Sequence, residues 1–169
     1  TFPDKCIDLV LTDPPYGVTQ NKWDKIVELD ELFRISNVVI LTAQQPYVSY
    51  LVEKHRRLFK YDLIWSKPLG SGFLNAKHMP MRNHEHILVF YDKLPIYNPQ
   101  MRKGELRRAE KVTSNSSNYG KQKPCKTEAH DEYYPKSVIE FSNANRREKE
   151  HPTQKPLELF KYLVLTYSK

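Results

Sequence analysis

Short apolar runs alternate along the chain with segments whose apolar residues recur at helical spacing. Four runs are rich in aliphatic, β-branched and aromatic residues, so they predict buried strands; they are residues 7–12, 38–41, 61–65 and 86–90. Three segments predict helices; they are residues 24–35, 46–58 and 156–163. Alternating strands and helices predict an α/β fold with a doubly wound sheet.

The first predicted helix has one apolar face and a candidate cap. Ile26, Leu29, Leu32 and Phe33 lie at helical spacing, and Asp24 stands where an N-cap is expected. We therefore expect the helix to begin at Asp24 and to bury this face.

The first strand ends at Asp13-Pro14-Pro15-Tyr16, and this motif has a narrow chemistry. Two prolines end the strand, and ligands of open α/β sheets bind at the carboxyl ends of strands. The Asp13 carboxylate and the Pro14 carbonyl accept hydrogen bonds, and Tyr16 offers a stacking face. Together they suit a planar ring that bears an amino group. Taken alone, the motif fits an ordinary loop equally well, with Asp13 capping a turn and Tyr16 packed.

Further motifs follow in a fixed order, and together they carry a family resemblance; they are Asn21-Lys22-Trp23-Asp24, Ile64-Trp65-Ser66-Lys67-Pro68, Asn83-His84-Glu85-His86-Ile87-Leu88-Val89-Phe90 and His151-Pro152-Thr153-Gln154-Lys155-Pro156-Leu157. With Asp13-Pro14-Pro15-Tyr16 they make the chain resemble the β class of DNA amino-methyltransferases, which modify adenine N6 or cytosine N4. The resemblance implies a Rossmann-like methyltransferase sheet and a flipped DNA base. It also implies that Asp13, Pro14, Pro15 and Tyr16 are catalytic, and that no metal is required. Asp at the first position favours adenine N6.

The resemblance implies S-adenosylmethionine as cofactor, held by Asp13 and by residues before the last helix, which are His151, Thr153, Gln154 and Lys155. In the β class a glycine-rich turn that holds most of the cofactor follows that helix, and this sequence stops at Lys169. The sheet is therefore expected to be incomplete, and the chain to be a fragment or remnant that binds the cofactor weakly. Its exposed flank would be covered by the missing segment, a partner or a second copy in a homodimer.

Basic residues are concentrated in one stretch. Eight lysines and arginines lie between Arg102 and Lys126 against two glutamates, which accounts for most of the net charge of +7. From composition alone, a solvated and partly flexible loop is the better interpretation. The resemblance instead implies a target-recognition insertion at residues 98–138, between core segments 1–97 and 139–169. Double-stranded DNA is then the partner. The candidate DNA contacts are Lys67, Arg102, Lys103, Arg107, Arg108, Lys111, Lys121 and Lys123. Of these, Arg102, Arg107 and Arg108 are also candidates to read base edges.

Other sequence features bear on metal binding, on phosphate binding and on the location of the protein in the cell. His84 and His86 lie in a predicted strand without an evident third ligand, so a structural role is favoured over a metal site. Gly70-Ser71-Gly72 lacks the third glycine of a phosphate loop and predicts a mobile loop near the active face. Two distant cysteines, no signal peptide and no apolar stretch of membrane-spanning length indicate a cytoplasmic protein without a membrane partner.

Two alternative functions stay open from the sequence. The chain could be a non-catalytic DNA-binding remnant that keeps the basic segment. The Pro-Pro-Tyr turn also occurs in methyltransferases for RNA bases or protein glutamine, although those usually carry Asn where this chain has Asp13.

Overall fold

The computed structural model describes residues 2–17, 21–22, 24–111, 114–118, 120–143 and 154–169. It divides into two compact units. The core unit comprises residues 1–98 and 136–169, and the basic unit comprises residues 99–135.

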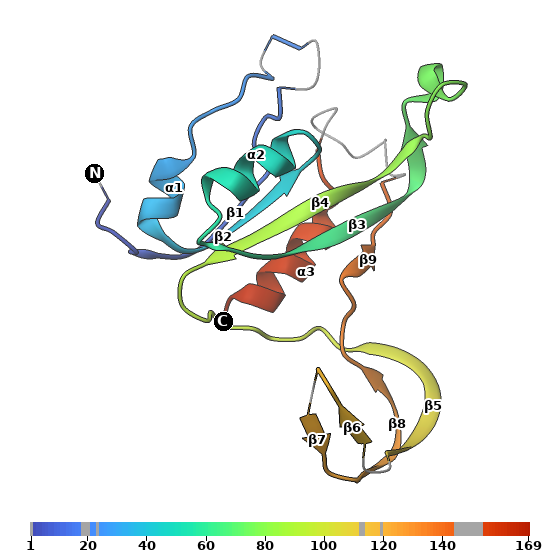
Figure 1. Ribbon diagram of the computed structural model, residues 1–169. Helices are drawn as coiled ribbons and strands as arrows, with labels where there is room; N and C mark the ends of the chain where they lie inside the picture. The colour runs from blue at the N-terminus through green and yellow to red at the C-terminus, as the bar shows by residue number, and fades with distance from the viewer. Residues whose placement is uncertain (1, 18–20, 23, 112–113, 119, 144–153) are drawn as a thin grey trace. The chain divides into compact units, whose positions relative to one another are not determined.

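The core unit is built on one mixed sheet of five strands in the order β1-β2-β4-β3-β9 (Figure 1). The strands are β1 (Ile7–Thr12), β2 (Ser36–Ala43), β3 (Phe59–Ser71), β4 (Arg82–Tyr91) and β9 (Val138–Glu140). β1 runs parallel to β2, and β9 runs parallel to β3, whereas β4 is antiparallel to both of its neighbours. The short connection from β3 to β4 explains this, because a parallel pair needs a longer crossover, usually a helix.

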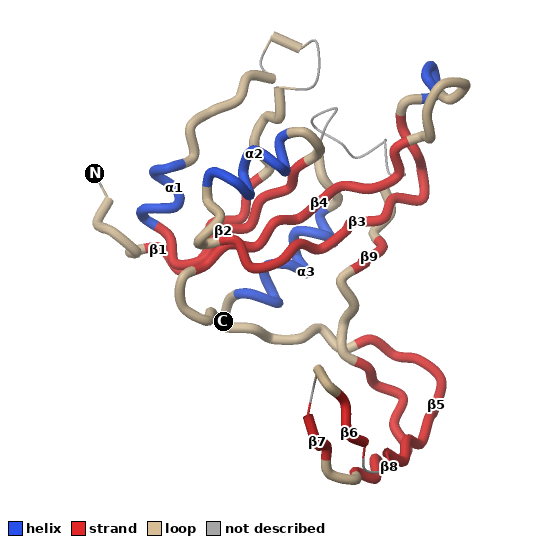
Figure 2. The backbone as a smooth tube through the Cα atoms, in the orientation of Figure 1, coloured by secondary structure: helices blue, strands red, loops and turns tan. Residues whose placement is uncertain are grey.

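Helices cover both faces of this sheet, which confirms the predicted doubly wound α/β fold (Figure 2). Helices α1 (Asp30–Ile35) and α2 (Tyr47–Lys54) pack on one face, and α3 (Leu157–Tyr167) packs on the other. Side chains alternate along β2 and β4 to fill the two cores. Val39, Leu41, Leu88 and Phe90 face α1 and α2, and the intervening residues face α3.

All four predicted strands are present, but the predicted bounds of the helices were wrong: the first two predictions are too long, and the last stops short of the end of its helix. The first helix begins at Asp30, not at Asp24. The Asp24 carboxylate instead accepts a hydrogen bond from the Gly17 backbone N–H at 2.8 Å, and Ile26 is exposed. Asp24 therefore closes the loop after the Asp13 motif and does not cap a helix. The second helix ends at Lys54, and the last runs on to Tyr167.

The β3–β4 connection also differs from its prediction. Gly70 and Ser71 belong to β3, and Gly72 adopts a positive φ of 88° before a short 3₁₀ turn, η1 (Phe73–Asn75). β3 and β4 thus form one long hairpin with an ordered tip.

The basic unit folds as strands where composition favoured a solvated loop. β5 (Arg102–Lys111) pairs antiparallel with β8 (Cys125–Tyr133), and β6 (Ser114–Ser116) pairs with β7 (Gly120–Gln122). Backbone hydrogen bonds define these strands without an alternating apolar face, so sequence periodicity could not reveal them.

No helix among the described segments has the length and apolar character needed to cross a membrane.

Candidate active site

Strand directions bring the sequence-predicted motif together with residues from three other strands. Asp13 directly follows β1, and Thr42 lies near the end of β2, whose parallel register pairs Thr12 with Leu41. Because β4 is antiparallel, its first half lies at this same edge of the sheet, with His86 opposite Ala43. The carboxyl ends of β1, β2 and β3 and the amino end of β4 therefore form one functional edge, as expected for ligand sites in α/β sheets.

Two hydroxyl groups occupy one oxygen of Asp13. The Tyr16 hydroxyl lies 2.7 Å from Asp13 Oδ1 and 2.9 Å from Thr42 Oγ1, and the Thr42 hydroxyl donates to the same Oδ1. Burial, with the neighbouring Asp13 carboxylate as a second cause, raises the pKa of Tyr16 far above its usual value. Tyr16 therefore stays a neutral hydrogen-bonding phenol, and it fixes the orientation of the carboxylate.

The second oxygen of Asp13 faces an ammonium group. Lys155 Nζ lies 3.0 Å from Asp13 Oδ2 and 3.2 Å from Glu85 Oε2, and Lys67 Nζ lies 2.7 Å from Glu85 Oε1. These four side chains, Asp13, Lys155, Glu85 and Lys67, are the charge cluster of the site. It contains two carboxylates and two ammonium groups, so its net charge is zero. Lys67 and Glu85 are nearly fully buried, where pairing is what makes a charge tolerable.

Two ammonium groups hold Glu85 in its charged form. Burial alone raises the pKa of Glu85, but the ammonium groups of Lys155 and Lys67 outweigh that effect. The pKa of Glu85 therefore lies below its ordinary value, and this carboxylate stays ionised at neutral pH.

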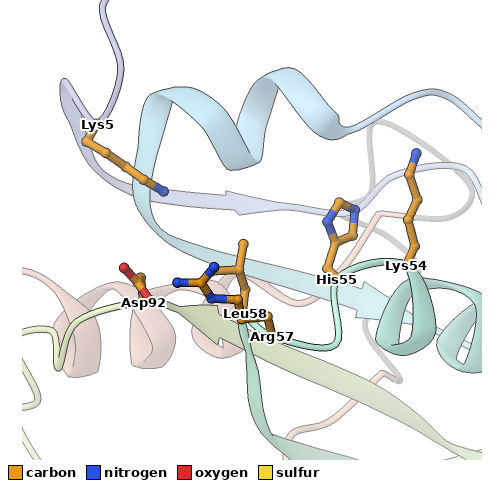
Figure 3. Close-up of a pocket in the computed structure, with 6 residues that line it drawn as sticks. All are labelled: Lys5, Lys54, His55, Arg57, Leu58 and Asp92. Atoms are coloured by element: carbon orange, nitrogen blue, oxygen red, sulfur yellow. The ribbon is translucent and has the colours of Figure 1, made fainter.

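A pocket at the opposite edge of the sheet does not share this chemistry. This cavity has a volume of about 420 Å³. It is lined by Lys5, Lys54, His55, Arg57, Leu58 and Asp92, which Figure 3 draws as sticks. Lys5 already donates to the carbonyls of Phe33 and Ser36, and Lys54 pairs with acidic residues. We therefore assign the functional site to the Asp13 edge.

Comparison with known proteins identifies the family. The N6/N4 methyltransferase family, described as DNA methylase, matches residues 38–169. The chain belongs to this family. The match begins after Asp13-Pro14-Pro15-Tyr16, so it is evidence independent of that motif. It includes Lys67, Glu85 and Lys155.

Two solved structures share the methylase fold. The complex of M1.HpyAVI with SAM superimposes with a TM-score of 0.53 at 16% identity, over 98% of this chain and 68% of that one. The cytosine-N4-specific PvuII DNA methyltransferase gives a TM-score of 0.61 at 12% identity, over 100% of this chain and 66% of that one. The chain thus spans about two thirds of each protein. No curated protein matches the sequence.

Lys67 of the methylase, a predicted DNA contact, is buried in the structure. Its ammonium lies against Glu85 and 5.2 Å from the centre of the Trp65 ring. A lysine held in this way is poorly placed to contact a DNA phosphate. We therefore assign Lys67 to the charge cluster.

The structure places only some of the predicted catalytic and cofactor-binding residues together. Asp13 and Lys155, which the resemblance assigned to the cofactor, lie in contact with one another, and Gln154, which precedes Lys155 in the sequence, is exposed. The Tyr16 ring is only 9% exposed, and Lys155 Nζ lies 5.4 Å from its centre, so the ring is not open for stacking in this state. His151 and Thr153 lie outside the described residues.

Sequence reasoning missed Thr42 and Glu85. A threonine in an aliphatic strand looks like an ordinary strand residue. Glu85 stands between two histidines, so its position suggests metal binding before it suggests an ion pair. His86 in fact pairs with Asp62 at 2.8 Å, and the described residues contain no group of three or more metal-binding side chains. One available signal was that Lys67 and Glu85 are charged residues next to buried strand runs, where a charge needs a partner.

In the basic unit, the predicted DNA-binding side chains that the structure describes are exposed; they are Arg102, Lys103, Arg107, Arg108 and Lys123. Arg102 stacks 5.2 Å from the centre of the Tyr133 ring, and Arg107 lies 3.3 Å from Glu105. Such exposed pairs are weak and can be exchanged for contacts with phosphate. The side chains of Lys111 and Lys121 lie outside the described part of the unit.

Proposed function

We propose that this DNA methylase transfers a methyl group from S-adenosylmethionine to the exocyclic amino group of a flipped DNA base, and that the base is adenine, modified at N6. One observation carries the proposal. Lys155 Nζ, an N–H donor, lies 3.0 Å from Asp13 Oδ2 and 5.4 Å from the centre of the Tyr16 ring. An amino group on a planar base would use the same acceptor and the same ring face.

In this mechanism Asp13 acts through its second oxygen. Oδ1 is held by Tyr16 and Thr42, so Oδ2 accepts one N–H of the base and the Pro14 carbonyl accepts the other. Accepting both protons localises the lone pair on the amino nitrogen. That nitrogen forms a bond to carbon as the sulfur–carbon bond of the methyl donor breaks. The nitrogen then loses one proton, for which the carboxylate of Asp13 is a more basic acceptor than the Pro14 carbonyl.

The base can stack on Tyr16 only after Lys155 has moved. Its ammonium now lies beside the ring and on the oxygen that the base requires. Glu85 is only 3.2 Å from the same ammonium, so it can keep Lys155 when Asp13 releases it. The target base must itself leave the helix, because its amino group is inaccessible inside the stack.

The charges of this edge fit the amino-acid end of S-adenosylmethionine, which carries one carboxylate and one ammonium group. Lys155 is complementary to the carboxylate, and Asp13 is complementary to the ammonium until its Oδ2 accepts the base. We assign cofactor contacts to these two residues together with His151, Thr153 and Gln154. A cofactor carboxylate would also draw Lys155 away from Asp13 and so prepare the site for the base. The cofactor supplies the electrophilic methyl group.

Duplex DNA is the proposed partner, bound through the basic unit. The arginines and lysines of the basic unit supply the phosphate contacts that dominate affinity for DNA. Double-stranded DNA is favoured over RNA because the family is one of DNA methylases and because Asp, not Asn, occupies the first position of the motif.

The test is methyl transfer from radiolabelled S-adenosylmethionine by the protein as its gene encodes it. Duplex DNA and RNA are compared as acceptors, and digested product is analysed for the methylated nucleoside. We expect label in DNA as N6-methyladenine. Label in N4-methylcytosine would contradict the choice of base, and label in RNA alone would contradict the substrate class. Absence of cofactor binding at millimolar concentration would contradict catalysis by this protein.

A further inference from the structure

The tip of the β3–β4 hairpin exposes an apolar surface that the proposed chemistry does not use. Phe73 is 77% exposed and Leu74 is 94% exposed, and Met79 and Met81 beside them are also exposed. Side chains of this kind are normally withdrawn from water, and clustered exposure marks an interaction surface. We call residues 69–81 the hairpin tip.

The hairpin tip is attached to the functional edge of the sheet. β3 carries Lys67, and β4 carries Glu85. Both strands therefore connect the charge cluster directly to the tip (Figure 1). Where the tip joins β4, Arg82 donates a hydrogen bond to Gln44, which lies two residues after Thr42. The hairpin therefore projects from the edge at which a flipped base would enter.

The charge of the hairpin suits a polyanion. Lys77 and Arg82 are cationic, and no Asp or Glu occurs between Pro68 and His84. A cationic ribbon with an apolar end is complementary to duplex DNA, whose phosphates lie outside and whose base faces are apolar. An apolar protein partner would not require the cations.

The dimensions also suit a duplex. An extended strand rises about 3.3 Å per residue, so Phe73 lies at most about 20 Å along the strand from Lys67. A two-stranded ribbon fits the major groove, which is about 12 Å wide. The tip can thus reach the bases while the functional edge faces the same stretch of DNA.

We propose that the hairpin tip contacts the base stack beside the flipped base, where Phe73 and Leu74 fill the space that opens. This inference rests on the proposed function, because it requires a DNA base to be flipped. Apolar side chains inserted at a base step offset part of the cost of unstacking. The tip therefore contributes to the opening of the target base pair rather than to the methyl transfer itself.

The experiment compares wild-type protein with the double variant Phe73→Ala/Leu74→Ala. The matched control is Leu94→Ala, because Leu94 is 85% exposed but follows the opposite end of β4. Two duplexes carry the sequence that the wild-type protein methylates. In one the target base is paired, and in the other it faces an abasic site, which removes the cost of unpairing.

On the paired duplex we expect the double variant to lose about tenfold or more in kcat/KM, which corresponds to about 1.4 kcal/mol. On the unpaired duplex we expect it to stay within about twofold of wild type, and Leu94→Ala should match wild type on both. An equal loss on both duplexes, or no loss on either, would overturn the inference. So would a changed oligomeric state of the double variant in sedimentation, which would make the tip a self-association surface. Inactive wild-type protein would instead contradict the proposed function.

Discussion

At the scale of single residues, the site is governed by four charges that neutralise one another. Each carboxylate of the charge cluster meets at least one ammonium group, and Glu85 meets two. Removing one member leaves a buried partner uncompensated, which costs more than the intact pair contributes. Glu85 is the most informative member to change, because it contacts both lysines and lies outside the predicted catalytic motif.

Glu85→Gln should lower the free energy of unfolding by about 3 kcal/mol at pH 7, because Lys67 and Lys155 then lose a buried counter-charge. Urea denaturation followed by circular dichroism measures this loss. Glu53→Gln is the control, since Glu53 is 79% exposed and lies 4.0 Å from Arg56. That control should change the free energy by less than about 1 kcal/mol. Equal effects of the two substitutions would show that the charge cluster does not stabilise the fold.

The same variant tests the direction of the Glu85 pKa shift. The folded-state pKa lies below the ordinary value of 4.5, so the stabilisation is present above that value. It is lost as the pH falls from 4.5 through the folded-state pKa. The stability difference between wild type and Glu85→Gln should therefore shrink as the pH is lowered below 4.5. A difference that grows under acid would mean that the pKa is raised.

At the scale of elements, the sheet depends on helices that pack from both faces. Helix α3 shows this most simply, because Leu159 and Leu163 are fully buried against β2 and β4 while Val164 is half exposed. One helix thus carries a core position and a surface position side by side.

Leu163→Ala should lower the free energy of unfolding by about 2–5 kcal/mol, because it leaves a cavity in the second core. Val164→Ala is the matched control and should change it by less than about 1 kcal/mol. Chemical denaturation of both variants measures the difference. If the two losses were the same, α3 would not be packed on the sheet as described.

The elements also show what sequence can predict. Strands 38–41 and 86–90 were recognisable because both their faces are buried, which produces continuous apolar runs. The start of α1 could not be predicted, because an aspartate at position 24 can either cap a helix or accept a hydrogen bond from the Gly17 N–H. Only the folded loop shows that it binds Gly17. The strands of the basic unit have no apolar alternation, so only backbone pairing reveals β5 and β8.

At the scale of the whole molecule, the charged residues form two groups of different character, the buried charge cluster and the exposed basic unit. The charge cluster is buried and neutral, so it orients groups without attracting DNA. The described basic side chains of the basic unit are exposed, so we expect this unit to attract DNA in a way that depends on salt. The concentration of basic residues was visible in the sequence, and the family resemblance assigned it to DNA. The charge cluster could not be predicted, because Lys67, Glu85 and Lys155 meet from three distant segments.

Neutralising Arg107 and Arg108 together should weaken DNA binding and reduce the slope of log K against log salt by about 2, if each contacts one phosphate. Fluorescence anisotropy with a labelled duplex over a series of salt concentrations measures the slope. Neutralising Arg56 and Arg57 is the matched control, because these arginines are consecutive and exposed in the core unit. A slope that falls only in the control would place the DNA away from the basic unit.

The central claim is that Asp13 holds the amino group that receives the methyl. Its most direct test is Asp13→Ala, measured by methyl transfer to duplex DNA and by DNA binding in parallel, with the exposed Asp92→Ala as control. The account predicts that Asp13→Ala abolishes transfer while DNA affinity stays within a few-fold of wild type, because the proposed phosphate contacts lie in the basic unit. Turnover by Asp13→Ala within a few-fold of wild type would contradict it.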